Sequence, residues 1–333
     1  MKRKLLRIAL ILAIAIPVLA LISELRFRTS IPDVYSGGRN GMWLRHSWVG
    51  DSRTVREYDD LAAMLKRMGI TDAFFHAGPF RGDGTIPPAK YSYAPDLIRN
   101  IRRTEPDIRL YVWLGQVEAK GGGLLDISYP QTRETILRTA TRFLEMGFDG
   151  IHLNIEPIYS NDPDYLDLLR ALHKVTNELG KRLSVSAYKP ERIPGTERIV
   201  RRVSRNPGYW QKEYFLKVAR EVDQVVVMTY DSGYPLPSMY GNSISRTAKW
   251  CIENGIDDLL IGIPSYDEYK GGHFPYVENL DNALLGLKQG VSTLDEEDRS
   301  KVGASIYAEW TTSDAERETF ISKWVQKNRD GRL

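Results

Sequence analysis

The chain has 333 residues, of which 42% are hydrophobic, and its formal charge is +3. Residues 1–28 alone carry a net charge of +5, so the rest of the chain carries −2 and lacks the basic excess of a nucleic-acid-binding protein. The single cysteine, Cys251, excludes an intrachain disulfide and has no metal-binding or redox spacing around it.

The N-terminal segment combines positive charge with an apolar run. "MKRKLLR" precedes "IALILAIAIPVLALIS" at residues 8–23, which is longer than a usual signal-peptide core and slightly short for a full membrane span. Val18-Leu19-Ala20 offers a weak cleavage site. We therefore expect residues 1–28 to be a signal peptide or membrane anchor and residues 29–40 to be a stalk. Either role of the first segment places the globular part outside the cytoplasm, anchored at the cell surface or secreted.

Short apolar runs then alternate with amphipathic segments. Strands are expected at 41–49, 71–78, 108–115, 148–156, 182–188, 223–230, 258–264 and 303–310. Helices are expected at 54–70, 94–106, 130–147, 163–180, 209–222, 243–255, 279–290 and 313–328. Eight alternations predict an α/β protein, a single-domain (β/α)8 TIM barrel over residues 41–333. The loops 189–208 and 264–277 then lie at the carboxyl end of the strands, where such barrels place active sites.

The fourth expected strand has an unusual polar face within "GFDGIHLNIEPIYSND", residues 147–162. Side chains alternate along a strand, so the apolar residues 151, 153 and 155 face the helices. His152, Asn154 and Glu156 then face the barrel interior, with Glu156 at the carboxyl lip. Buried polar groups need hydrogen-bond partners, which either the fold or a ligand supplies.

Three motifs carry a resemblance to glycoside hydrolase family 18, the chitinase-like enzymes. "DGIHLNIE" resembles the fourth-strand pattern Asp-x-x-Asp-x-Asp-x-Glu of that family: Asp149 and Glu156 match, while His152 and Asn154 replace the middle aspartates. "VVVMTYDSG" resembles its Met-x-Tyr-Asp segment, and the eighth expected strand ends in a tryptophan, as in the family. The matching residues are Met228, Tyr230, Asp231 and Trp310.

The resemblance implies a retaining, substrate-assisted glycosidase that acts on β-linked N-acetylglucosamine and needs no cofactor. Chitooligosaccharide, peptidoglycan and N-glycan cores are all open as substrates. Glu156 would be the general acid/base, Tyr230 would bind the acetamido oxygen, and Asp231 would order that pocket.

Asn154 departs from the family pattern. Its carbonyl oxygen can accept the acetamido N–H but adds no negative charge, and the Asn-x-Glu arrangement resembles that of a related endo-N-acetylglucosaminidase family. We hypothesise that His152 hydrogen-bonds Asn154 and fixes its orientation.

Two alternatives stay open. The first is a catalytically silent, lectin-like barrel that binds glycan at the cell surface. The second is a glycosidase that uses two protein carboxylates, with Asp231 or Asp149 as the partner of Glu156.

Further substrate-binding candidates come from motif position and from aromatic residues near strand ends. With Trp310, they are Asp149, His152, Met228, Tyr188 and Trp43. No metal-ligand spacing is present: His46 and His76 lie near the ends of the first two strands, and His173 and His273 are expected at the surface.

Overall fold

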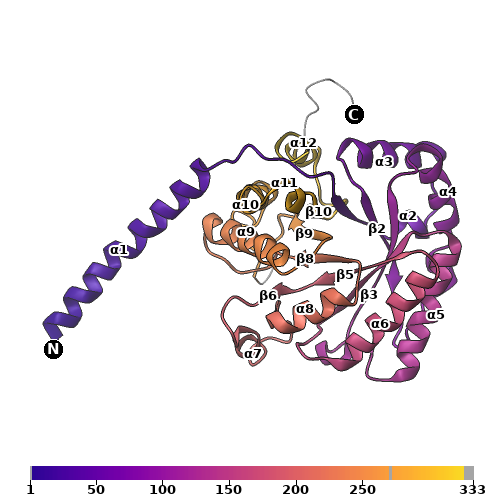
Figure 1. Cartoon of the computed structure of the whole chain (residues 1–333), viewed down its shortest axis with the longest axis horizontal. Coiled ribbons are helices and arrows are strands. Elements are labelled where there is room, and N and C mark those ends of the chain that lie inside the picture. The colour runs from indigo at the N-terminus through magenta and orange to yellow at the C-terminus, as the bar shows by residue number, and fades with distance from the viewer. Residues whose placement is uncertain (1, 270–271, 326–333) are drawn as a thin grey trace.

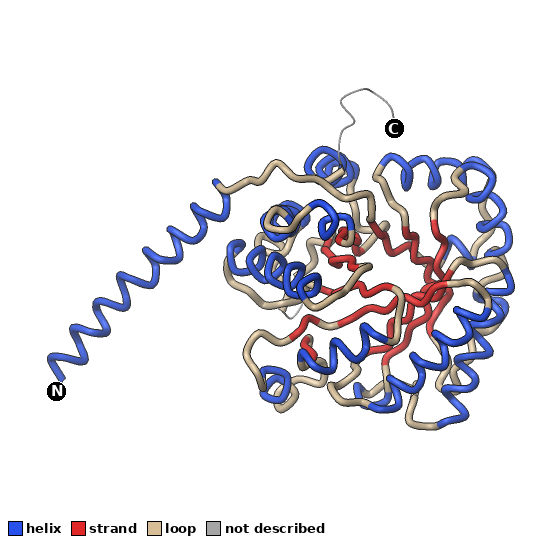
Figure 2. Tube along the Cα trace, viewed as in Figure 1, coloured by secondary structure: helices blue, strands red, loops and turns tan. Residues whose placement is uncertain are grey.

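The computed structural model describes residues 2–269 and 272–325, with the side chains of the first helix described from residue 13 onward. Eight parallel strands close into a barrel in the order β1-β10-β9-β8-β5-β4-β3-β2 (Figures 1 and 2). They are β1 Asn40–Leu44, β2 Asp72–Pro79, β3 Arg109–Val117, β4 Gly150–Glu156, β5 Arg182–Ala187, β8 Gln224–Met228, β9 Leu259–Pro264 and β10 Val302–Tyr307. The closed parallel barrel confirms the predicted (β/α)8 fold.

Helices surround the barrel (Figure 2), and residues at their ends are of the types expected to start and end helices. The longer ones are α3 Val55–Arg67, α4 Ala94–Thr104, α5 Pro130–Met146, α6 Pro163–Glu178, α8 Lys212–Arg220, α9 Pro237–Glu253, α10 Leu280–Val291 and α12 Asp314–Lys323. Thr54 forms a capping box with Glu57 at the start of α3. Pro130 opens α5, and Gly147, at φ 118°, ends it in the left-handed region that favours glycine.

Several boundaries differ from expectation. The first strand ends at Leu44 because Ser47–Gly50 forms the short helix α2. The helix expected from residue 209 begins at Lys212, because β7 (Tyr209–Trp210) pairs with β6 (Lys189–Pro190). Short helices α7 (Thr196–Val200) and α11 (Glu296–Ser300) lie in the connecting segments. The last expected helix extends to 328, but residues 326–328 lie outside the described part of the chain.

Helix α1, Lys2–Thr29, projects from the barrel (Figure 1). No helix is both long and apolar enough to cross a membrane within the described residues, which leave out the side chains of the first part of the expected apolar run. The last turns of α1 dock on α9, where Glu24 accepts a hydrogen bond from the Ser238 amide at 2.8 Å and Phe27 is buried. The segment expected to be a stalk lies against the barrel, because the Ser36 amide donates to the Trp324 carbonyl at 2.7 Å.

The barrel interior has an aromatic layer and a charged layer. Trp43, Phe74, Tyr111 and Trp113 pack together in the lumen, separate from the aliphatic layer under the helices. Below them, at the amino ends of the strands, lies a set of paired polar residues that we call the basal belt. It consists of Asp72, Arg109, Arg182, Gln224 and Asp258.

Ion pairs hold the basal belt together. Both oxygens of the buried Asp72 accept from Arg109, at 2.7 and 2.8 Å. Asp258 pairs with Arg182 at 2.7 Å and accepts from Gln224 at 3.1 Å. These bonds form two groups at the end of the barrel opposite Glu156: one joins β2 to β3, and the other joins β5 to β8 and to the start of β9.

Candidate active site

Glu156 is the last residue of β4, so its carboxyl group lies at the carboxyl end of the barrel. The alternation of the strand places Ile151, Leu153 and Ile155 in the aliphatic layer, as expected. Burial raises the pKa of the Glu156 carboxyl, and the negative charge of Asp231 raises it further. A carboxyl group with a raised pKa keeps its proton nearer neutral pH, as a general acid requires.

Three polar side chains oppose that shift without reversing it. Tyr188, Asn154 and Asn206 lie beside the Glu156 carboxyl and lower its pKa. Tyr188 follows β5 directly and is buried, so it approaches Glu156 from the neighbouring strand. These groups stabilise the ionised form, which must also exist if the same carboxyl later acts as a base.

The side chain of Asn154 has its amide group next to Glu156. The amide lies beside the Glu156 carboxyl, whereas the buried carbonyl oxygen Oδ1 has no hydrogen-bond partner within the described structure. Such an orphaned acceptor is costly unless a ligand donates to it. Asn154 therefore presents an open acceptor next to the candidate acid.

The hypothesis that His152 orients Asn154 is wrong. His152 is fully buried, and its Nε2 accepts from the indole N–H of Trp43 at 3.0 Å. Because an indole N–H can only donate, the proton of the neutral ring is on Nδ1, which lies 2.9 Å from Ser184 Oγ. Burial lowers the pKa of His152 to about 3, so the ring is neutral at physiological pH.

His152 instead joins the site to the basal belt. Ser184, its partner on β5, donates onward to Gln224 at 2.8 Å, and Gln224 donates to Asp258. The ring also stacks on Phe74, with centroids 4.1 Å apart. His152 therefore belongs to the packed interior beneath the site, and so does Trp43, which is completely buried. Both were expected to bind substrate, and the structure places them below that level.

The Met-x-Tyr-Asp segment leaves the end of β8 beside this group. Met228 ends the strand and is buried, while Tyr230 is half-buried and its ring stacks on Tyr307 at a centroid distance of 5.3 Å. Asp231 has φ 52°, and its Oδ1 accepts from the Tyr266 hydroxyl at 2.6 Å. The structure thus brings Tyr230 and Asp231 to the same end of the barrel as Glu156.

Tyr307 occupies the position that Trp310 was expected to hold at the end of the eighth strand. Strand β10 ends at Tyr307, and its ring contacts the rings of Trp43, Tyr230 and Trp310. Trp310 lies three residues further on, 38% exposed and packed edge-on against Tyr307. Tyr307 packs on the aromatic layer of the lumen, and we call this ring and the layer beneath it the aromatic floor. Trp310 offers an exposed aromatic surface beside it.

Asp149 lies at the opposite end of the barrel from Glu156. It precedes β4, and its carboxylate accepts from the Leu110 amide at 2.7 Å and pairs with Arg102. Seven strand residues separate it from the carboxyl lip, roughly 23 Å at 3.3 Å per residue. Asp149 therefore anchors the start of the strand, which corrects its assignment to substrate binding.

The four remaining histidines comprise one neighbouring pair and two separate residues. His46 and His76 lie near the first two strand ends, with ring centroids 5.9 Å apart, and burial lowers the pKa of His76 to about 4. His173 is partly exposed on α6, 3.5 Å from Asp223. His273 was expected at the surface but is fully buried.

No family model and no curated protein matches the sequence. Solved structures match the fold. A class V chitinase from Pseudomonas fluorescens Pf-5 aligns with a TM-score of 0.59 at 14% identity, over 87% of this chain and 99% of that one. The spore cortex-lytic enzyme SleL of Bacillus cereus aligns with a TM-score of 0.56 at 12% identity, over 87% and 75%. The GH18 chitinase ChiB of Flavobacterium johnsoniae gives 0.52 at 13%, over 87% and 94%. The chain has the barrel fold of these enzymes.

Within this barrel, sequence reasoning missed three residues that contribute to the site. No role in the site was predicted for Tyr307, which lies within the strand expected at 303–310. Asn206 reaches Glu156 from the loop 189–208, whose place at the carboxyl end was expected. Tyr266, which binds Asp231, comes from the second such loop. The sequence feature that could have indicated Asn206 and Tyr266 is the presence of tyrosines and asparagines in the two long loops.

Proposed function

We propose that this protein is a glycosidase that hydrolyses β-linked N-acetylglucosamine-containing glycans by a retaining, substrate-assisted mechanism. The observation that carries the proposal is the pairing of Glu156 with Asn154. Burial raises the pKa of the Glu156 carboxyl, and the carbonyl oxygen of Asn154, the residue beside it, is buried without a hydrogen-bond partner in the described structure. A sugar with a 2-acetamido group supplies both the leaving oxygen that the acid needs and the N–H that the amide lacks.

In the first step, Glu156 donates its proton to the glycosidic oxygen, and the bond from that oxygen to the anomeric carbon breaks. The acetamido oxygen of the substrate forms a bond to the anomeric carbon, which gives an oxazolinium ion. Asn154 Oδ1 accepts the acetamido N–H and holds the group in the attacking orientation. The Tyr230 hydroxyl donates to the acetamido oxygen.

In the second step, the ionised Glu156 removes a proton from water, and the water oxygen attacks the anomeric carbon. The bond from that carbon to the acetamido oxygen breaks, which opens the oxazolinium ring, restores the acetamido group and gives net retention. Asn154, Tyr188 and Asn206 favour the ionised carboxylate at this stage. The aromatic floor of Tyr307 and the exposed ring of Trp310 fit the apolar face of a sugar.

The alternatives have less support. A lectin-like barrel has no need of a buried carboxyl group with a raised pKa at the strand end. A mechanism with two protein carboxylates loses Asp149 as a candidate, because it lies at the other end of β4. Asp231 would then be the second carboxylate, and cleavage would extend to sugars without a 2-acetamido group.

The test compares the full chain with its Glu156→Gln variant and with Glu134→Gln, a control on the exposed face of α5. Each is incubated with chitooligosaccharides, peptidoglycan and the matching oligosaccharides without acetamido groups, and new reducing ends are measured by mass spectrometry. We expect cleavage of acetamido sugars only, with a loss of roughly 10³-fold in Glu156→Gln and none in Glu134→Gln. Equal activity of parent and Glu156→Gln rejects the proposal, and cleavage of sugars without acetamido groups rejects the substrate-assisted step.

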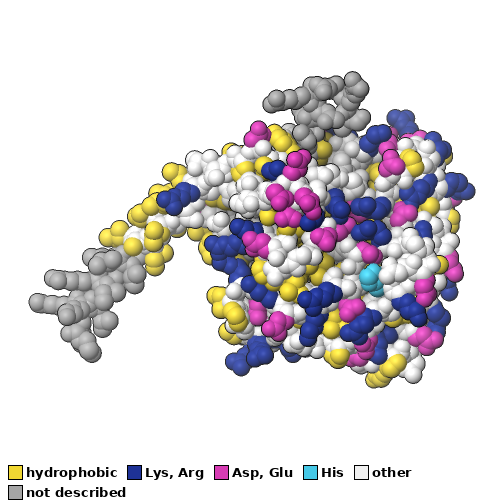
Figure 3. Space-filling view, viewed as in Figure 1, with side chains coloured by type: hydrophobic (Ala, Val, Ile, Leu, Met, Phe, Trp, Pro, Cys, Tyr) yellow, Lys and Arg dark blue, Asp and Glu magenta, His cyan; other side chains and the backbone are white. Residues whose placement is uncertain are grey.

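We also propose that the barrel acts outside the cytoplasm and that α1 associates with a membrane. Apolar side chains are exposed along the described part of α1 (Figure 3). Ile14, Leu19 and Leu25 are among the exposed residues. Basic residues precede them in the sequence. Fractionation of cells that express the full chain tests this: the protein should sediment with membranes and be digested by external protease. Recovery in the cytoplasmic fraction would contradict it.

A further inference from the structure

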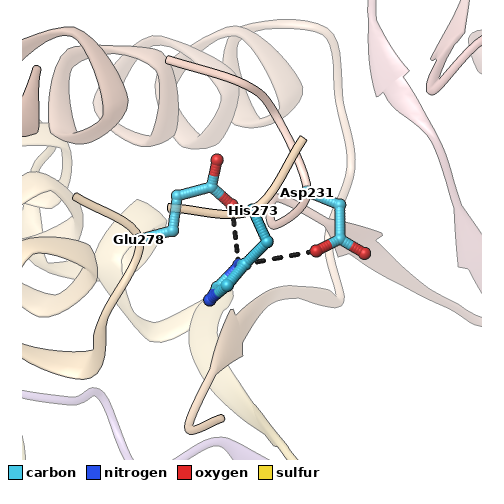
Figure 4. A group of neighbouring side chains, drawn as sticks. All are labelled: Asp231, His273 and Glu278. Atoms are coloured by element: carbon cyan, nitrogen blue, oxygen red, sulfur yellow. Dashed lines mark ion pairs between the residues drawn. The ribbon is translucent and has the colours of Figure 1, made fainter. Parts of the chain in front are cut away.

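Three metal-ligating side chains meet at the rim of the barrel, and we call them the rim cluster: Asp231, His273 and Glu278 (Figure 4). Asp231 lies just after β8, and the other two come from the segment between β9 and α10. His273 Nδ1 lies 3.3 Å from Glu278 Oε2 and 3.5 Å from Asp231 Oδ1. His273 and Glu278 are completely buried, although neither position was predicted to be in the interior.

The rim cluster contains two buried atoms without partners. His273 Nε2 lies 3.2 Å from the Tyr266 carbonyl, which can only accept, so Nε2 carries the proton. In the neutral ring, Nδ1 is then a bare lone pair directed at two carboxylate oxygens. Nδ1 and Glu278 Oε2 both lack a hydrogen-bond partner in the described structure. A lone pair that faces two anionic oxygens is repulsive unless a cation lies between them.

The carboxylates are already oriented by other groups. Glu278 uses Oε1 to accept from the Ser232 amide at 2.9 Å, the Ser232 hydroxyl at 2.7 Å and the Gly233 amide at 3.1 Å. This leaves Oε2 free to face His273. Asp231 accepts from the Tyr266 hydroxyl, and His273 donates to the carbonyl of the same residue. Ligating histidines and carboxylates in metal sites carry such outer partners, which fix the direction of each ligand.

We propose that the rim cluster binds one divalent transition-metal cation of the Zn²⁺ type. Two ligands bonded at 2.0–2.1 Å in tetrahedral geometry lie about 3.4 Å apart, close to the separations of the imidazole nitrogen from its two carboxylate oxygens. One imidazole and two carboxylates suit Zn²⁺ better than Ca²⁺ or Mg²⁺, which prefer oxygen ligands alone. Three protein ligands leave a fourth position for water. The cation would fasten the segment after β9 to the turn after Tyr230.

The competing explanation for the arrangement of the rim cluster is a second proton on His273 in place of a metal ion. A doubly protonated His273 would form ion pairs with both carboxylates and would leave no room for a metal. Binding measurements on the full chain separate the two, and their readout does not depend on glycosidase activity. The two proposals share Asp231, but the result of the binding test can be distinguished from the result of the hydrolysis test.

The first experiment strips the full chain with a chelator, removes the chelator and titrates ZnCl₂ by calorimetry at neutral pH. We expect one equivalent to bind with saturation. Free Zn²⁺ at 100 times the dissociation constant should raise the melting temperature by roughly 5 °C. MgCl₂ and CaCl₂ should leave the melting temperature unchanged. Absence of saturable Zn²⁺ binding by the folded parent overturns the proposal.

Variants locate the binding. His273→Gln and Glu278→Gln should each weaken Zn²⁺ binding by at least about 100-fold, whereas His173→Gln, a matched change on α6, should bind like the parent. Parent-like binding by both rim variants overturns the assignment. If neither variant folds, anomalous scattering from a zinc-soaked crystal of the parent decides, since the peak must lie at bonding distance from His273 Nδ1. A peak elsewhere overturns the proposal.

Discussion

The two ends of the barrel differ in whether their buried polar groups have hydrogen-bond or ion-pair partners. At the amino end, the basal belt pairs its charges: Asp72 with Arg109, and Asp258 with Arg182 and Gln224. At the carboxyl end, buried polar atoms of Asn154, His273 and Glu278 have no partner among the described residues.

This comparison separates stability from function. An ion pair whose hydrogen bonds are complete offers a ligand no unpaired polar atom. A buried acceptor without a partner, beside a carboxyl group with a raised pKa, costs free energy that a bound ligand recovers by donating to it. Changes in the basal belt should therefore alter the free energy of unfolding and leave the chemistry intact. Changes at the carboxyl end should do the reverse.

The largest expected effect is on stability. Asp72→Ala leaves the Arg109 guanidinium without its carboxylate, and because Arg109 is partly exposed, we expect the free energy of unfolding to fall by about 3 kcal/mol. Chemical denaturation measures this, and activity per folded molecule should not change. Asp60→Ala, at an exposed ion pair on α3, is the control and should change stability by less than about 0.5 kcal/mol. Equal losses of stability in Asp72→Ala and Asp60→Ala would contradict the distinction between the two ends of the barrel.

Asn154→Ala should show the opposite pattern. Loss of the open acceptor should lower kcat/KM on chitooligosaccharides roughly 10²-fold, about 2.7 kcal/mol of transition-state stabilisation. Stability should fall by only about 1 kcal/mol, because the amide loses its contact with the Glu156 carboxyl while the carbonyl oxygen has no partner to lose. Asn100→Ala on α4 is the control for the substitution itself. A loss of activity that follows the loss of folded protein would contradict the prediction.

His152 connects the two ends, and its effect should appear in the pH dependence of stability. Its pKa is lowered to about 3 in the folded protein, against about 6.5 in the unfolded chain. Between these values the unfolded chain binds more protons, so this contribution is complete above pH 6.5. It is lost as the pH falls, at up to about 1.4 kcal/mol per unit.

The measurement is the slope of unfolding free energy against pH from 7 to 4, in the parent and in His152→Gln. The variant should have the shallower slope, whatever its stability at pH 7. His76 contributes to both slopes in the same direction and cancels in the comparison. Parallel slopes would show that His152 is not held neutral by burial.

The smallest effect concerns exposed aromatic rings. Trp310→Ala should raise KM for chitooligosaccharides about 5- to 10-fold with a smaller change in kcat, because its exposed ring can cover a sugar face. Tyr35→Ala is a matched control, since Tyr35 is equally exposed but packs against Lys288, away from the site. A KM change in both variants, or in neither, would remove Trp310 from the binding surface.

The sequence was sufficient for the barrel because its eight apolar and amphipathic alternations each fit one strand and one helix. It also placed Glu156, Asn154 and His152 on the inner face, since alternation decides the face of a strand. Alternation does not decide which other strands supply the partners. His152 is bonded to Ser184 on the neighbouring strand β5 and, across the lumen, to Trp43 on β1, whose position depends on closure of the barrel.

The errors at the rim have a similar cause. Trp310 was expected at the end of β10, but the strand ends at Tyr307, and motif position alone could not show this. His273 was expected at the surface because it lies in a loop. That loop folds back on the turn after β8, where the Gly233 amide donates to the Gly272 carbonyl at 2.6 Å. Contacts between two loops leave no periodic pattern in the sequence.

The docking of α1 has a mechanical consequence. Gly241 of α9 leaves room for the Phe27 ring, since a Cβ there would lie 2.2 Å from it, and the Gly241 backbone also lies close to Gly286 of α10. The docked position of α1 therefore depends on the side chain missing at residue 241: a larger residue there would push the Phe27 ring, and with it the end of α1, away from α9.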